Sequence, residues 1–141
     1  MKSIQNIFCS DNPKYNEKLM KKLTATNSIN YLQAFKLELS AGQLQDFPKR
    51  RFVITPSFIC DYKNEPVIFP ICNIINVYRT NIINNEYNYN SMALAIETNY
   101  NTRMFLLQSI RNINDAEFNN IVQIIRNRIS IMNNNLNKGE V

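Results

Sequence analysis

Hydrophobic residues recur at helical spacing near each end of the chain. In residues 12–24 the apolar side chains lie three or four positions apart, after Asp11 or Asn12 as a cap and Pro13 at the first helical position. In residues 115–132 Asn114 and Glu117 resemble a capping box. A continuous apolar stripe follows there, made of Phe118, Ile121, Val122, Ile125, Ile129 and Met132. The pattern predicts a short helix over 12–24 and a longer amphipathic helix over 115–132.

The middle of the chain has the turn signals and short apolar runs of β-strands. Strands are predicted over 51–55 and 57–62, on either side of Pro56, and again over 67–71; residues 73–78 are expected to form another short strand or a turn leading into one. Pro70 cannot donate a hydrogen bond to a neighbouring strand, so it is expected at a sheet edge or in a bulge. The clearest hairpin joins strands near 92–98 and 103–109, and the preceding residues 80–91 are interpreted as a polar loop rich in Asn and Tyr.

Residues 31–40 fit two patterns. Alternation of apolar and polar side chains up to Leu37 and Leu39 indicates a strand, whereas the spacing of Leu32, Phe35 and Leu39 is equally typical of a helix. We expect the strand, because a glycine-containing turn follows and another strand is predicted soon after it. The helix stays open as the alternative.

The order of these elements resembles bacterial pleckstrin-homology-like (PH-like) and GRAM-like domains. The similarity lies in the strand and hairpin of residues 50–65 and in the run 69–79, where Asn73 occupies a position that is often acidic in those families. The later hairpin and the C-terminal helix complete the family's order. The resemblance implies an α+β fold, with a strongly bent antiparallel sheet or partial barrel that is capped by the C-terminal amphipathic helix. The short N-terminal helix is an addition to that pattern.

This resemblance also implies a division of the chain. We expect an N-terminal helical extension over residues 1–30, a PH-like domain over 31–132 and a flexible Asn-rich tail over 133–141. The chain length of 141 residues suits one domain of ordinary size.

The residue types available argue against catalysis. The chain has no histidine, only two glycines, and three cysteines that are not spaced as CxxC. A nucleophilic thiol therefore has no imidazole base, a structural zinc lacks ligands, and no glycine-rich phosphate loop is present. We expect no enzymatic activity, no metal and no cofactor. Cys60 and Cys72 lie in apolar runs and are expected to be buried, and reduced thiols favour the cytoplasm.

The formal net charge of +5 comes from the N-terminal third of the chain. Residues 1–51 hold nine Lys or Arg against four acids. The basic residues include four lysines between positions 14 and 22 and the cluster Lys49, Arg50 and Arg51. They could bind an anionic membrane or nucleic acid, although a solvated lysine-rich face is the simpler interpretation. No segment has the length and apolar character of a membrane span.

A protein contact is the favoured function. Tyr87 and Tyr89 lie in the loop 80–91, which has no Lys or Arg to hold a phosphate. Tyrosine supplies contact area at low conformational cost, so Tyr87, Tyr89 and the neighbouring Arg79 are predicted to take part in protein recognition. The chain is therefore expected to be a non-catalytic interaction module. The basic N-terminal residues carry the alternative of a peripheral membrane or nucleic-acid binder.

Overall fold

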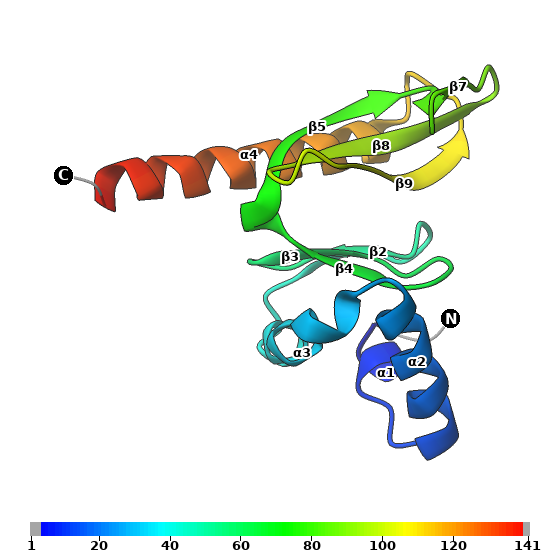
Figure 1. The fold of residues 1–141 in the computed structure, drawn as a ribbon, viewed down its shortest axis with the longest axis vertical. Helices are drawn as coiled ribbons and strands as arrows, with labels where there is room; N and C mark the ends of the chain where they lie inside the picture. Colours follow the sequence, from blue (N-terminus) through cyan, green and yellow to red (C-terminus); the bar gives the residue numbers. More distant parts are fainter. Residues whose placement is uncertain (1–3, 140–141) are drawn as a thin grey trace. The chain divides into compact units, whose positions relative to one another are not determined.

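The computed structural model describes the backbone of residues 4–139 and the side chains of residues 4–134. The chain is α+β and divides into two compact units, Met1–Pro70 and Ile71–Val141. Each unit has its own sheet and its own helices, and each is described by itself below (Figure 1).

The first unit begins with helical segments. These are α1 (Ile4–Phe8), α2 (Pro13–Ala25), the 3-10 turn η1 (Ser28–Tyr31) and α3 (Leu32–Ser40). The Asn12 side chain caps α2, because its Oδ1 accepts hydrogen bonds from the backbone N–H groups of Lys14 and Tyr15 at 3.0 and 3.3 Å. The predicted helix over 12–24 is thereby confirmed. The helix α1 was not predicted, since a single turn leaves too short a periodic pattern.

The expected strand over 31–40 is wrong, and α3 takes its place. Leu32, Phe35 and Leu39 are buried on one face, whereas Leu37 is 72% exposed. A strand would have put Leu37 on the same face as Leu39. Gly42 explains the error: its φ of 72° and its N–H, which donates to the Leu39 carbonyl at 3.1 Å, end the helix in a left-handed cap.

Four antiparallel strands complete the first unit, and they adjoin in chain order: β1 (Gln45–Phe47), β2 (Phe52–Ile54), β3 (Phe58–Asp61) and β4 (Val67–Pro70). Pro70 lies in the edge strand β4, as predicted. The helical segments cover one face of this sheet (Figure 1), and the shared core includes Phe8, Leu23, Phe35, Val53, Phe58, Cys60 and Ile68. Edge-to-face packing of the rings of Phe8 and Phe35, with centroids 5.1 Å apart, joins α1 to α3.

The second unit pairs a three-stranded sheet with one long helix. A 3-10 turn, η2 (Ile71–Asn73), leads into β5 (Ile74–Thr80), and the hairpin strands β8 (Ser91–Thr98) and β9 (Arg103–Ile110) complete the antiparallel order β5-β8-β9. The helix α4 (Ala116–Gly139) packs along β5 (Figure 1). Among the described residues none of the three sheets closes on itself, so the expected partial barrel is not seen.

The helix α4 confirms the predicted stripe and corrects both of its ends. Phe118, Ile121, Val122 and Ile125 are buried. Asp115, not Asn114, caps the helix, because its Oδ1 accepts the Phe118 N–H at 3.0 Å. The backbone stays helical to Gly139, where the sequence had predicted a flexible tail from 133; residues 140–141 of that tail lie outside the described residues.

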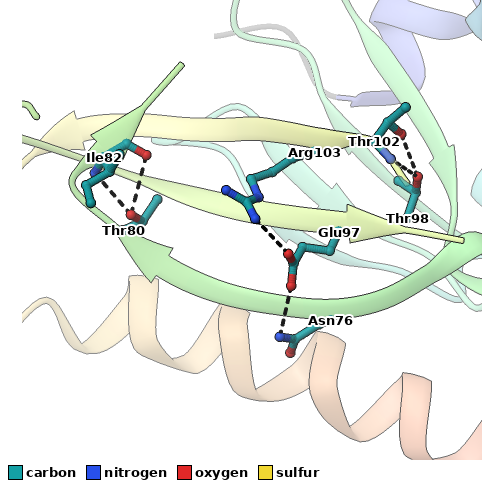
Figure 2. A network of polar contacts seen from close by, with 7 residues as sticks. All are labelled: Asn76, Thr80, Ile82, Glu97, Thr98, Thr102 and Arg103. Carbon is teal, nitrogen blue, oxygen red and sulfur yellow. Dashed lines mark hydrogen bonds and ion pairs between the residues drawn. The ribbon is translucent and has the colours of Figure 1, made fainter. Parts of the chain in front are cut away.

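Polar contacts join the three strands on the exposed side of the hairpin. The Glu97 carboxylate on β8 accepts hydrogen bonds from Asn76 on β5, at 3.3 Å, and from Arg103 on β9, at 3.0 Å (Figure 2). At the hairpin turn, the Thr98 and Thr102 hydroxyls contact each other (Figure 2). These cross-strand pairs hold the register of the sheet, although exposed pairs contribute little to stability.

The segment predicted as an irregular loop contains a second, small hairpin. Strands β6 (Ile82–Ile83) and β7 (Glu86–Tyr87) pair across Asn84 and Asn85, whose φ angles are 53° and 67°. Two consecutive residues with positive φ are typical of a type I′ turn, and asparagine tolerates that conformation. The prediction of an irregular loop over 80–91 is therefore wrong for residues 82–87.

Candidate functional site

Exposed hydrophobic side chains gather in the second unit, around the small hairpin and the connection from β9 to α4. Tyr89, Ile110 and Ile113 are 70%, 83% and 62% exposed, and Ile82 and Tyr87 on the hairpin are also exposed. We call the group formed by Tyr89, Ile110, Arg111 and Ile113 the Tyr89 surface. Large apolar side chains that stay in water as a group are typical of a contact site.

The strands and turns around it bring the Tyr89 surface together. Ser91 pairs with Ile110 in the β8–β9 ladder, and the Arg111 N–H donates to the Asn90 carbonyl at 3.0 Å. The Arg111 guanidinium lies 5.8 Å from the centre of the Tyr89 ring, a cation–π contact. An open hollow of about 620 Å³ results, lined by Tyr89, Asn90 and residues 110–113.

The small hairpin extends this surface. Ile82 and Tyr87 are cross-strand partners, and the Asn88 N–H donates to the Asn81 carbonyl at 2.8 Å, which closes the base of the hairpin. The exposed Tyr87 is thus carried on paired backbone, and Tyr89 lies in the following turn, where the Ser91 N–H donates to the Asn88 carbonyl at 3.4 Å. A fixed backbone reduces the ordering entropy that a partner would otherwise have to offset.

Arg79 holds the connection between β9 and α4 in place. Its Nη1 donates to the Ile113 carbonyl at 3.2 Å and to the Asn119 Oδ1 at 3.0 Å. The Asn119 side chain in turn donates to the same Ile113 carbonyl at 3.2 Å. Arg79 is therefore a positioning residue beneath Ile113, a role that its place next to the predicted loop did not reveal.

The predicted site residues fall into two groups. Arg79, Tyr87 and Tyr89 belong to the second unit, in the region just described. The basic cluster of residues 49–51 belongs to the first unit, where it forms the turn between β1 and β2. Lys49 and Arg51 are exposed, and Arg50 is half-buried.

Sequence reasoning missed Ile110, Arg111 and Ile113. Ile110 ends a strand whose apolar run predicts burial, and Ile113 sits in a short polar connection. A signal was nevertheless present in the sequence. The earlier residues of β9 already provide its apolar run, so the predicted core has no place for Ile110 and Ile113, which flank Arg111. This signal can be used only when the residue at which the strand ends is known.

The thiols differ from the prediction at one position. Cys60 is fully buried, and burial raises its pKa well above the ordinary value of 9.0, which opposes thiolate formation. Cys72, predicted to be buried, is exposed, because it lies in η2 rather than in a strand, and its Sγ contacts the Asn73 Oδ1 at 3.6 Å. Cys9 is also exposed.

Within the described residues, no three His, Cys, Asp or Glu side chains are grouped as metal ligands, and no helix is long and apolar enough to cross a membrane. No protein-family model, curated protein or solved structure is significantly similar to this chain.

Proposed function

We propose that the protein is a non-catalytic interaction module that binds another protein chain through the Tyr89 surface. The observation that carries the proposal is the exposed grouping of Tyr89, Ile110 and Ile113 beside Arg111. Tyrosine and arginine are over-represented among the residues that dominate the energy of protein interfaces. The aliphatic side chains offer the apolar area that such a contact must bury.

The chemistry of the surface also suggests what the partner presents. Arg111 is the charged member of the Tyr89 surface, and Glu86 lies on the adjoining hairpin. A partner with apolar side chains at the centre of its contact face and a carboxylate near Arg111 would complement it. Stacking of the guanidinium on Tyr89 leaves its edge N–H groups able to donate to that carboxylate.

We further propose PH-like membership and a cytoplasmic location. The element order supports the first: a four-strand antiparallel meander, then a strand and hairpin, then a C-terminal helix. An experimental structure tests it, because membership requires the two sheets to pack around one core that the terminal helix closes. Exposed thiols at Cys9 and Cys72 favour a reducing compartment.

Site-directed photo-crosslinking in the native host tests the proposed contact. A photoreactive phenylalanine analogue replaces Tyr89 in one variant and Tyr100 in the other. Tyr100 is a matched control, since it is 68% exposed on the turn between β8 and β9. The proposal expects one protein to be captured from position 89 and not from 100, with the capture lost when Ile113→Ser is added. Equal capture from both positions, or none from 89, would refute it.

A further inference from the structure

The first unit contains a pocket that the proposed protein contact does not use. It has a volume of about 400 Å³ and lies between α1, α2 and the two turns that join β1 to β2 and β3 to β4. Its lining consists of Ile7, Tyr15, Leu19, Lys22, Arg51, Tyr62, Lys63, Asn64 and Pro66. Segments far apart in the sequence therefore meet at one cavity.

Three of the lining residues are cations from three different elements. Lys22 comes from α2, Arg51 from the first turn and Lys63 from the second, and no carboxylate lines the cavity. Among the residues whose side chains the structure describes, none of the three takes part in an ion pair; the lysine that pairs on α2 is Lys21, with Glu17 at 3.8 Å. The side chains that line the pocket thus carry a net positive charge, which favours an anion.

The arginine is held in an unusual backbone conformation. Arg51 has a φ of 51°, its N–H donates to the Pro48 carbonyl at 3.2 Å, and its carbonyl accepts the Tyr62 N–H at 2.9 Å. A non-glycine residue with positive φ is uncommon, and here hydrogen bonds on both sides fix it. The turn therefore fixes the backbone of Arg51, whose side chain lines the cavity.

Two carboxylates adjoin residues of the pocket lining and accept hydrogen bonds from them. The Asp61 Oδ1 accepts the backbone N–H of Lys63 at 3.0 Å. Asp46 accepts a hydrogen bond from the Tyr62 hydroxyl at 3.0 Å. Burial, followed by this hydrogen bond and the Asp46 charge, raises the pKa of Tyr62, so the phenol stays neutral in the physiological range. Tyr62 consequently adds no negative charge that would oppose an anion.

Apart from Asn64 and the tyrosine hydroxyls, the rest of the lining is apolar. Leu19 and Pro66 are buried and Ile7 is half-buried, while Tyr15 contributes an aromatic ring. A free inorganic ion would leave this part of the cavity unfilled. An anion with an apolar or aromatic body would bury it and gain the corresponding hydrophobic free energy.

We infer that this pocket binds a small organic phosphate, with its phosphate on Lys22, Arg51 and Lys63 and its apolar body against Ile7, Leu19 and Pro66. A phosphate dianion matches three cations better than a singly charged carboxylate does. The inference is independent of the Tyr89 surface, which belongs to the other unit.

Calorimetric titration of the full chain with phenyl phosphate tests the assignment. This probe joins a phosphate monoester to a ring, whereas inorganic phosphate lacks the ring and phenyl sulfate carries one charge fewer. The inference expects phenyl phosphate to bind most tightly, with an affinity that rises as pH passes through the second phosphate pKa of about 6. Equal affinity for all three probes, or no binding of phenyl phosphate, would overturn it.

Substitutions locate the binding. Arg51→Gln and Lys22→Gln should each weaken phenyl phosphate binding about tenfold, as expected for the loss of a charged hydrogen bond. Lys21→Gln is the matched control, because Lys21 is the neighbour of Lys22 on α2 but does not line the cavity. Circular dichroism verifies that each variant is folded. Equal weakening by Lys21→Gln would indicate a diffuse charge effect and contradict a defined pocket.

A vesicle sedimentation experiment distinguishes a lipid headgroup from a small soluble phosphate as the ligand. Vesicles of phosphatidylcholine, with and without phosphatidic acid, are spun down with the protein. The inference expects free phenyl phosphate to bind whether or not vesicles do. Binding that needs phosphatidic acid and Arg51, with no binding of phenyl phosphate in solution, would refute a small-molecule ligand and assign the pocket to a membrane headgroup.

Discussion

The guanidinium of Arg79, in strand β5, lies 3.2 Å from the carbonyl oxygen of Ile113, in the connection that leads to α4. This contact ties the connection between β9 and α4 to strand β5. A side chain that the sequence assigns to partner recognition also holds the backbone at an exposed isoleucine. The relationship makes the conformation of residues 111–115 dependent on Arg79.

Arg79→Ala should therefore loosen that connection. We expect a loss of about 1 kcal/mol in the free energy of unfolding, because both hydrogen bonds are exposed to solvent. Amide hydrogen exchange of residues 111–115, followed by mass spectrometry, should become faster. Arg103→Ala is the control, since Arg103 is an exposed arginine of the same sheet that pairs with Glu97. Unchanged exchange in Arg79→Ala, or the same acceleration in both variants, would contradict the positioning role.

Ile121→Ala tests the packing of α4. Ile121 is fully buried, so its truncation should cost about 2–5 kcal/mol through lost burial and the cavity left behind. Ile131→Ala, on the same helix but 56% exposed, should change the free energy of unfolding by less than about 0.5 kcal/mol. Urea denaturation measures both. Similar small effects in the two variants would show that the predicted stripe does not face the core of the second unit.

Gly42 offers a test of the helix that replaced a predicted strand. At its φ of 72°, an added Cβ would meet no atom within 4 Å, so any cost of substitution comes from the backbone conformation alone. Gly42→Ala should destabilise the protein by about 1 kcal/mol, and Gly42→Asn by less, because asparagine tolerates the left-handed region. Thermal unfolding compares them. Equal stability of the wild type and Gly42→Ala would rule out this helix end.

The extent to which each of the three thiols is buried predicts which cysteines react with a thiol reagent and how the free energy of unfolding changes at alkaline pH. Cys9 and Cys72 should react quickly with a small thiol reagent, and Cys60 only on unfolding. The pKa of Cys60 is raised in the folded state, so its stabilising contribution is complete below about pH 9 and is lost as pH rises further. Cys60→Ala should flatten the fall in stability above about pH 9, whereas Cys72→Ala should not. Rapid labelling of Cys60 in the native protein would contradict its burial.

Much of the fold could be predicted from local patterns. The helix capped by Asn12, the edge strand at Pro70 and the hairpin across residues 99–102 follow from short-range rules of capping, proline chemistry and alternation. The strand predicted over 31–40 failed because Gly42 was interpreted as a turn between strands, although a left-handed glycine also ends helices. The exposure of Leu37 distinguishes the helix from the strand, and exposure depends on the tertiary structure.

The candidate site was only partly visible in the sequence. Tyr87 and Tyr89 stood out because they interrupt an asparagine-rich segment. Ile110 did not, since an isoleucine at the end of a strand is normally buried, and Ile113 did not, since it lies in a short polar connection. The pocket beside Arg51 was also hidden, because its cations are supplied by segments that only the fold brings together, as Lys22 and Lys63 show.

The affinity of the captured partner, measured by calorimetry on purified proteins, tests the proposed interaction module most directly. We predict that Tyr89→Ala weakens binding at least tenfold, as truncation of an interface tyrosine does when it carries the contact, and that Tyr100→Ala leaves the affinity unchanged. Both variants must first show the wild-type unfolding temperature. Binding that survives Tyr89→Ala undiminished, or that falls equally with Tyr100→Ala, would contradict the account.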